Sequence, residues 1–423
     1  MTQLANAPAP VDPGSTAWML VSSALVLLMV PGLALFYGGL VRRKNVLTTM
    51  LQSFAAMGLI GVQWIVIGYA LAFGTSHGGW IGFDPRLLAL SGLPYTQNFA
   101  DKAIPELVFV MFQGKFAIIT PALISGAVAE RMKFSAYVWF VLLWATLVYC
   151  PLAHWVWNAE GWLFKYGVLD FAGGTVVHIS SGISALVLAI MLGPRRDYRP
   201  GHGAILPHNL VLTLLGAGLL WFGWFGFNAG SAVAIDHPVA GHVAGLAFAT
   251  TQTAAAAGAL TWLLIEWWHQ RRPTSLGLAS GILAGLVAIT PAAGHVTPAA
   301  ALVFGAVAAT LCFLAVQVKP RFGYDDSLDA FGVHGVGGLI GALLTGLFCF
   351  IPVAGWAMGG GPGQFVKQAV GAGVSVAFAA AGTFVIAALL KATVGLRATD
   401  EEERDGLDIS VHGERAYHQV ISS

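Results

Sequence analysis

Long apolar stretches alternate with short polar segments along almost the whole chain. Eleven stretches carry few charged residues and reach the roughly 17 residues or more that a helix needs to cross a bilayer. They cover residues 16–41, 46–73, 105–129, 134–157, 173–193, 209–231, 242–266, 275–291, 296–318, 331–352 and 369–392. The pattern predicts an all-α polytopic membrane protein with eleven transmembrane helices.

Composition supports a membrane protein and excludes other classes. Of the 423 residues, 57% are hydrophobic and only 10% are charged, whereas about 25% are charged in soluble domains. Lys and Arg number 21 against 20 Asp and Glu, so the chain lacks the basic surface that nucleic-acid binding requires. The high apolar content also excludes a disordered chain.

Basic residues gather in the loops on one side of the predicted bundle. Twelve lie after the first, third, fifth, seventh and ninth stretches: Arg42, Arg43, Lys44, Arg131, Lys133, Arg195, Arg196, Arg199, Arg271, Arg272, Lys319 and Arg321. The opposite loops hold Arg86, Lys102, Lys165 and Lys367. Because positive charge stays on the cytoplasmic side, we expect an external N-terminus and a cytoplasmic C-terminus in the cell (inner or plasma) membrane.

The C-terminal segment differs from the rest of the chain. We divide the chain into a transmembrane domain, residues 1–396, and a cytoplasmic tail, residues 397–423, which begins with a charged run at 400–405. The tail is either a solvated end or a regulatory segment. In the second case the acidic run would face basic loop residues, namely Arg195, Arg196, Arg271 and Arg321.

A faint internal repeat places two histidines in equivalent positions. LDFAGG at 169–174 precedes His178, and LDAFG at 328–332 precedes His334. The two motifs lie five stretches apart and would enter the membrane from opposite sides, which predicts an inverted five-helix pseudo-repeat. The histidines would then meet in a pore and share one N–H···N bond; packing is the alternative. Asp170 is an N-cap or a negative charge beside a cation site.

Aromatic residues accompany these polar groups. Phe112 and Phe116 are one helical turn apart, Phe227 and Ser231 are one turn apart, and Trp157 ends the fourth stretch. A tryptophan at a span end is typically an interfacial anchor, but its ring can also bind a cation at a pore mouth. The phenylalanines are core residues or a gate.

Motifs for catalysis and metal binding are weak. Glu266-x-x-His269 is one half of a di-iron pair, and the chain has neither a phosphate-binding loop nor a nucleophile elbow. We therefore expect no metal, no cofactor and no enzymatic activity. Metal analysis of the purified protein would test the membrane-metalloenzyme alternative.

The order of motifs resembles the ammonium transporter (Amt/Mep/Rhesus) family, on its Amt branch. The resemblance covers nearly the whole chain and rests on PGLALFYGGLVRRKN at 31–45, FQGKFAIITPALISGAVAERMKFSA at 112–136, HWVW at 154–157, LDFAGGTVVH at 169–178, GWFGFNAGS at 223–231, FGVHGVGG at 331–338 and TVGLRATDEEERDGLDISVHGERAY at 393–417.

This resemblance implies a homotrimer in the lipid bilayer, with one hydrophobic pore per subunit that conducts ammonium or ammonia, and also methylammonium. It implies an outer ammonium-recruitment site, a phenylalanine gate, a pair of pore histidines and several supporting residues. The recruitment site would consist of Trp157, Phe116 and Ser231, and the gate of Phe116 and Phe227. The pore histidines would be His178 and His334. The supporting residues would be Asp170, Phe112, Trp224 and Thr290.

The resemblance also implies a cytoplasmic partner, a PII-type nitrogen regulatory protein. The alternative to a transporter is an ammonium sensor that signals through such a partner with little flux. Lys115 departs from the expected pattern, because a small or uncharged residue is expected between Phe112 and Phe116. Neighbouring helical residues differ by about 100°, so we expect Lys115 to point away from the pore.

Overall fold

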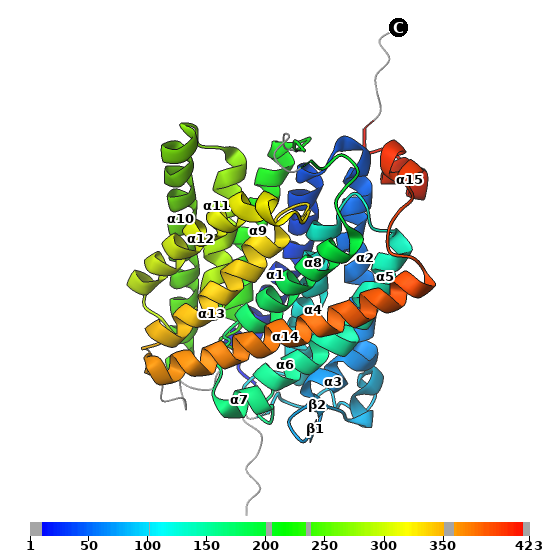
Figure 1. Cartoon of the computed structure of the whole chain (residues 1–423). Coiled ribbons are helices and arrows are strands. Elements are labelled where there is room, and N and C mark those ends of the chain that lie inside the picture. Colours follow the sequence, from blue (N-terminus) through cyan, green and yellow to red (C-terminus); the bar gives the residue numbers. More distant parts are fainter. Residues whose placement is uncertain (1–10, 101, 200–204, 234–237, 351–358, 418–423) are drawn as a thin grey trace, which may run out of the picture.

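The computed structural model describes residues 11–100, 102–199, 205–233, 238–350 and 359–417 (Figure 1). Its α-helices are α1 Pro13–Leu40, α2 Val46–Gln63, α3 Tyr69–Phe73, α4 Glu106–Val128, α5 Phe134–Trp144, α6 Cys150–Trp157, α7 Trp162–Tyr166, α8 Ser180–Leu192, α9 Leu210–Gly230, α10 Pro238–Gln270, α11 Ser275–Ile289, α12 Pro298–Phe322, α13 Val336–Phe348, α14 Pro362–Thr393, α15 Asp400–Asp405 and α16 Leu407–His412.

Short elements of other kinds join or extend these helices. The strands β1 Ser76–His77 and β2 Ile81–Gly82 form an antiparallel hairpin. Turns of 3₁₀-helix lie at Arg43–Asn45 and Pro85–Leu90. Turns of π-helix occupy Trp64–Gly68, Ala145–Tyr149, Gly174–Ile179 and Phe331–Gly335, each continuing directly into an α-helix.

All eleven predicted stretches are helical within the described residues. Ten of the resulting helices are long and apolar enough to span a membrane, and α11 is a shorter apolar helix. Helix α10 extends the seventh stretch at both ends, α14 begins at Pro362 instead of residue 369, and α13 ends at Phe348. Residues 351–352 of the tenth predicted stretch lie outside the described residues. The predicted all-α, multi-span fold class is confirmed.

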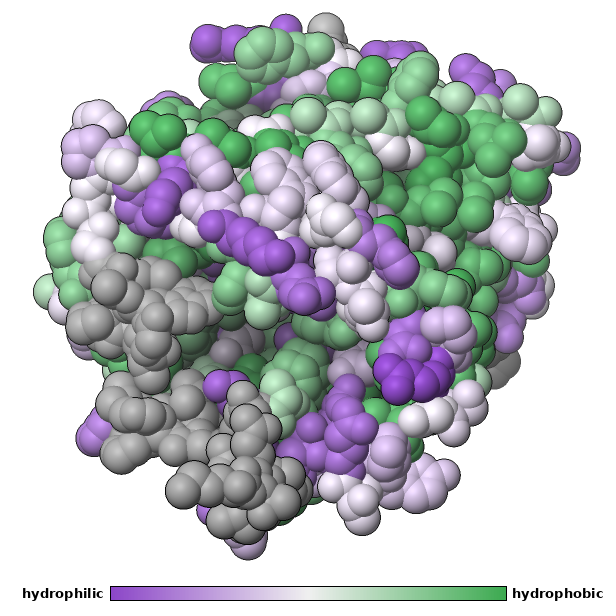
Figure 2. Space-filling view, turned by 90° about the horizontal axis from the view of Figure 1, so that it is seen from below, coloured by the Kyte–Doolittle hydropathy of each residue, from purple (hydrophilic) through white to green (hydrophobic). Residues whose placement is uncertain are grey.

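The two described ends of the chain lie at opposite ends of the bundle. Asp12 N donates to Ala103 O at 2.8 Å, in the loop that follows the β1–β2 hairpin. The tail helix α15 lies at the other end in Figure 1, as an odd number of crossings requires. Figure 2 views the hairpin end, where hydrophilic residues lie across the face and hydrophobic residues extend to the flanks.

Small residues allow close contact between helices around the centre of the bundle. Helices α1 and α9 pack along their length, and α8 crosses the π-helical turn that leads into α13. At this crossing a Cβ atom added to Gly182 would lie 2.1 Å from Gly335 N. Glycine at residue 182 therefore permits the backbones to approach closely.

The tail is docked on the loops at its end of the bundle. Asp408 is buried, and its carboxylate accepts from Leu47 N at 3.0 Å and Thr48 N at 2.8 Å, which caps the start of α2. Leu407 N donates to Asn45 Oδ1 at 2.9 Å, and Lys44 Nζ donates to Glu403 O at 2.7 Å. The tail is therefore held by hydrogen bonds that are buried or partly buried.

These contacts correct the predicted ones. Arg196 does contact the acidic run, through Asp400 O at 3.2 Å, but Arg195 instead forms ion pairs with Asp325 and Glu130. Much of the charge of the run is balanced inside the tail, where Arg397 pairs with Glu403 and Arg404 pairs with Glu401 and Asp405. Sequence charge alone did not show that the helix terminus of α2 would bind Asp408, a carboxylate outside the acidic run.

Candidate functional site: a narrow passage between two vestibules

A cavity of about 260 Å³ opens near the hairpin end of the bundle. Its walls include Trp157, the last residue of α6, together with Phe116, Asp170 and Ser231. We call it the Trp157 vestibule. Trp157 Nε1–H donates to Asp170 O at 2.9 Å, and its ring meets the Phe116 ring edge-on at 5.8 Å. Ser231 Oγ–H donates to Phe227 O at 2.8 Å, so its lone pairs are available to an N–H donor.

Asp170 acts as a helix cap and also lines this vestibule. Its Oδ1 accepts from Gly173 N and Gly174 N, and its Oδ2 accepts from Thr175 N and Val176 N, all within 2.9 Å. Burial raises the pKa of Asp170 to about 6, against the effect of these four backbone N–H donors. The four backbone N–H donors favour the ionised form of the carboxylate, so Asp170 can serve both as a cap and as a local negative charge.

Two phenylalanine rings separate the Trp157 vestibule from a much narrower segment. The rings of Phe116 and Phe227 stack with centroids 4.2 Å apart. Beyond them the cavity shrinks to about 10 Å³, which is close to the minimum that holds one water molecule. Its lining contains no charged side chain among the described residues: Met29, Leu33, Phe36, Tyr37, Ile119, Leu123, Val177, His178, Leu220, Trp224, Phe227, Leu283 and His334.

The predicted histidine pair lies in this narrow segment. His178 Nδ1 and His334 Nδ1 are 3.3 Å apart, and the two rings are nearly parallel at 12°. Two neutral imidazoles can make this contact if one donates its N–H and the other accepts it. His178 Nε2 is buried and has no hydrogen-bond partner within the described part of the chain. The pair therefore offers polar edges to a small neutral molecule in an otherwise apolar passage.

Both histidines lie in π-helical turns that follow a capping aspartate. His178 lies in Gly174–Ile179 and His334 in Phe331–Gly335. The residue five positions before each histidine has positive φ: Gly173 at 115° and Asp329 at 59°. We name residues 170–178 the first histidine segment and residues 326–334 the second histidine segment.

The equivalence of the two segments corrects the predicted alignment of the repeat. Asp326, not Asp329, is the counterpart of Asp170, because each lies eight residues before its histidine. Asp326 accepts from Ala330 N at 3.0 Å and Phe331 N at 2.8 Å, and burial raises its pKa. Asp329 pairs instead with Lys319 at 2.5 Å. The similarity of the letters LDFA and LDAF suggested a register that is wrong by three residues.

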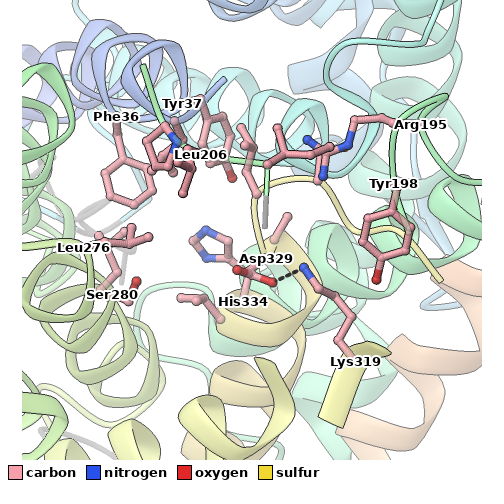
Figure 3. A pocket seen from close by; sticks show the side chains of 18 of the residues that line it. Phe36, Tyr37, Arg195, Tyr198, Leu206, Leu276, Ser280, Lys319, Asp329 and His334 are labelled. Atoms are coloured by element: carbon pink, nitrogen blue, oxygen red, sulfur yellow. Dashed lines mark hydrogen bonds and ion pairs between the residues drawn. The ribbon is translucent and has the colours of Figure 1, made fainter. Parts of the chain in front are cut away.

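A larger cavity of about 550 Å³ lies on the other side of the histidine pair. We call it the His334 vestibule. Figure 3 shows His334 in this cavity with the Lys319–Asp329 pair beside it and Tyr37 and Arg195 among the surrounding residues. A narrow cavity with no charged lining residue among those described thus lies between two wide vestibules, and the stacked Phe116 and Phe227 rings close it from the Trp157 vestibule. This geometry suits a small solute able to cross without charge.

Comparison with known proteins agrees with this geometry. A family model described as Ammonium Transporter Family matches residues 17–417. The chain is 49% identical to an ammonium transporter of Bacillus subtilis, over 96% of this chain and 99% of the relative. The chain belongs to the ammonium transporter family.

Solved structures of this family have the same fold. Mep2 of Saccharomyces cerevisiae superposes with a TM-score of 0.82 at 39% identity, covering 93% of this chain and 89% of that one. A protein described as Sensor Amt Protein superposes with a TM-score of 0.84 at 31% identity, covering 94% and 98%. This chain is therefore a multi-pass membrane protein that transports ammonium, and it is a transporter rather than an enzyme.

Most residues predicted from the family resemblance line the passage of this ammonium transporter. Trp224 lies against His178 with ring centroids 5.4 Å apart, and its Nε1–H donates to Thr290 Oγ1 at 2.9 Å. Thr290 thus orients Trp224 from behind. Phe112 lines none of the three cavities and packs against Phe116 at 4.9 Å. Lys115 also lines none of them, as expected.

Several lining residues were not predicted. Lys102, Gln113 and His295 line the Trp157 vestibule, and Tyr37 and Lys319 line the His334 vestibule. Lys102 and His295 lie in loops, and Tyr37 and Lys319 lie in the last turns of α1 and α12, where sequence periodicity gives little direction. Gln113 lies inside α4, and its polar side chain was overlooked. Asp326 could have been found, because the spacing of eight residues from aspartate to histidine occurs in both segments.

Proposed function

We propose that the Trp157 vestibule captures ammonium from outside the cell. The π face of Trp157, the ring of Phe116 and the Ser231 oxygen can bind a cation that carries N–H donors, and each cation–π contact is worth about 0.5–2 kcal/mol. The ionised carboxylate of Asp170 adds a negative charge to the same wall. Methylammonium, which keeps three N–H donors, fits the same description.

We further propose that the captured cation loses a proton near the Phe116–Phe227 stack and crosses as ammonia. A bare cation in a low-dielectric passage costs several kcal/mol even after relaxation, and a segment of about 10 Å³ leaves no room for a hydration shell. Ammonium can avoid this cost by leaving its proton behind, whereas potassium cannot. The histidine pair then exchanges hydrogen bonds with ammonia along the way.

The assembly and its regulation form part of the same proposal. The excess of basic residues in one set of loops supports a cytoplasmic C-terminus, so the His334 vestibule would be the cytoplasmic one. Residues 1–396 would form the conducting domain of a homotrimer, and residues 397–423 a regulatory tail through which a PII-type protein acts. The hydrogen bonds that the Asp408 carboxylate of the tail accepts from the start of α2 support such coupling.

The observation that carries the conduction mechanism is the 3.3 Å contact between His178 and His334 in an uncharged passage. The test is flux and current measured together in proteoliposomes for His178→Ala and His334→Ala, with ammonium and with potassium. We expect slower ammonium conduction or potassium leakage, with assembly unchanged. Unaltered rate and selectivity in both variants would contradict the proposed role.

The structural similarity to the Sensor Amt Protein is one specific observation that favours the alternative function, an ammonium sensor. Ammonium uptake by cells depleted of other carriers separates the two functions. Uptake at the wild-type rate after loss of the cytoplasmic partner would indicate that transport, not signalling, is the main role.

A further inference from the structure

The two vestibules contain equivalent hydrogen bonds made by different side chains. In the Trp157 vestibule, the carbonyl of the capping residue Asp170 accepts from Trp157 Nε1 at 2.9 Å. In the His334 vestibule, the carbonyl of the equivalent capping residue, Asp326, accepts from Lys319 Nζ at 2.8 Å. Trp157 ends α6 and Lys319 lies in the last turn of α12. Both donors therefore come from the long apolar helix before a histidine segment, with only the short helix α7 between Trp157 and the first segment.

This difference gives the two mouths opposite electrostatic character. Trp157 presents an aromatic face, which attracts cations, whereas Lys319 is itself a primary ammonium ion fixed beside His334 (Figure 3). Asp329 pairs with Lys319 at 2.5 Å. The Lys319 side chain is only 13% exposed, so solvent screens its charge incompletely.

Charged residues other than Lys319 also surround the His334 vestibule. Arg195 is balanced from behind by Asp325 at 2.8 Å and Glu130 at 3.4 Å. The exposed Arg199 lines the same cavity, so among the described lining residues two cationic side chains, Lys319 and Arg199, face one carboxylate, that of Asp329. The Asp326 carboxylate also attracts Lys319, but it lies outside this lining and accepts from the backbone N–H groups of Ala330 and Phe331. Among the described residues that line the Trp157 vestibule, one cationic side chain, Lys102, is matched by one carboxylate, Asp170.

We propose that Lys319 is a specificity-determining residue that gives the pore its sidedness: a fixed ammonium group at the cytoplasmic mouth replaces the aromatic capture surface of the outer mouth and prevents cytoplasmic cations from binding beside His334. Neutral ammonia leaves past it without this penalty. The inference rests on the proposed capture of ammonium at Trp157. The proposed effect of Lys319 is on the half-saturating substrate concentration at each side of the membrane. It does not change the equilibrium distribution of substrate, which no residue of a passive transporter can alter.

The test uses membrane vesicles of known orientation that contain the full-length protein. Labelled methylammonium uptake and efflux give one half-saturating concentration for each side. We expect Lys319→Gln, which keeps an N–H donor but removes the charge, to lower the cytoplasmic half-saturating concentration by about tenfold and to leave the outer one unchanged. Lys319→Arg keeps the charge and should behave as wild type. Arg321→Gln, an exposed change in the same helical turn, is the matched control.

A second variant guards against a purely structural effect. Asp329→Asn removes the counter-charge of Lys319, and asparagine tolerates the positive φ at this residue. We expect the cytoplasmic half-saturating concentration to rise, opposite to the change in Lys319→Gln. Equal changes on both sides, or no cytoplasmic change in either variant, would overturn the inference. Trp157→Leu in the same vesicles tests outer capture separately, because it should alter only the outer value.

Discussion

The first and second histidine segments differ at most positions and yet place their histidines in the same way. Aligned on their aspartates, residues 170–178 and 326–334 share the aspartate, the valine before the histidine and the histidine. Both nevertheless combine a capping carboxylate, a positive φ three residues later and a π-helical turn. The position of the histidine therefore depends on backbone geometry, which different side chains can support, while the remaining positions are free to give each mouth its own chemistry.

The largest expected effect comes from separating the helical turns that directly follow the two histidine segments. Gly182→Ala places a Cβ atom 2.1 Å from Gly335 N, so the helices must move apart. We expect a loss of about 3 kcal/mol in the free energy of unfolding and the loss of ammonium flux. Thermal unfolding and proteoliposome flux measure these effects.

Gly373→Ala is the matched control, because a Cβ at this exposed helical residue meets nothing within 4 Å. It should be neutral or slightly stabilising. Normal flux in Gly182→Ala would mean that close contact of the segments is not required.

The two capping carboxylates should differ in the stability that they contribute. Asparagine has one oxygen acceptor, so Asp170→Asn leaves part of a four-donor cap unsatisfied, whereas Asp326 accepts from two N–H donors. We expect losses of about 2 kcal/mol for Asp170→Asn and about 1 kcal/mol for Asp326→Asn. Shifts in Tm measure both, with the exposed Asp405→Asn as a control. Equal shifts would contradict the difference in cap geometry.

A smaller effect, on substrate capture, is expected from changing Trp157, the aromatic side chain that distinguishes the outer mouth from the other. Trp157→Leu keeps an apolar side chain but removes the π face and the N–H bond to Asp170 O. We expect weaker capture by about 1 kcal/mol, measured as a higher half-saturating concentration for methylammonium uptake. Trp268→Leu, a change at a residue 81% exposed on α10, should leave uptake unchanged. An unchanged half-saturating concentration in Trp157→Leu would indicate that Trp157 is an interfacial anchor.

The smallest effect is expected when the second segment is made more like the first. Asp329→Gly removes the cost of positive φ for a residue with a Cβ atom but also removes the Lys319 ion pair. These contributions oppose each other, so we expect a net change within about 0.5 kcal/mol. A large loss of stability in thermal unfolding would show that the ion pair holds the segment in place.

Much of the fold could be predicted from sequence because bilayer thickness fixes the length of apolar stretches. The pairing of His178 with His334 also followed from their positions in the repeat. The register of the second segment could not be predicted in this way, because a capping residue is identified by the backbone N–H groups that it binds. The LDAF motif contains Asp329, which lies three residues after the true cap, Asp326. The sites of tail attachment were equally hidden, since Asp408 binds the unsatisfied N–H groups of α2 rather than an arginine.

The π-helical turns have a consequence for how each pore histidine can change during evolution. A π-helical turn holds one residue more than the α-helical turn it replaces. Deleting one residue from Thr175–Val177 would allow the turn to relax to α-helix and would rotate everything on one side of it by about 100° relative to the other. His178 would then face away from His334 even though no pore residue had been substituted. The passage thus depends on residue count as strictly as on residue identity, and insertions or deletions in these two turns should be far less tolerated than substitutions in them.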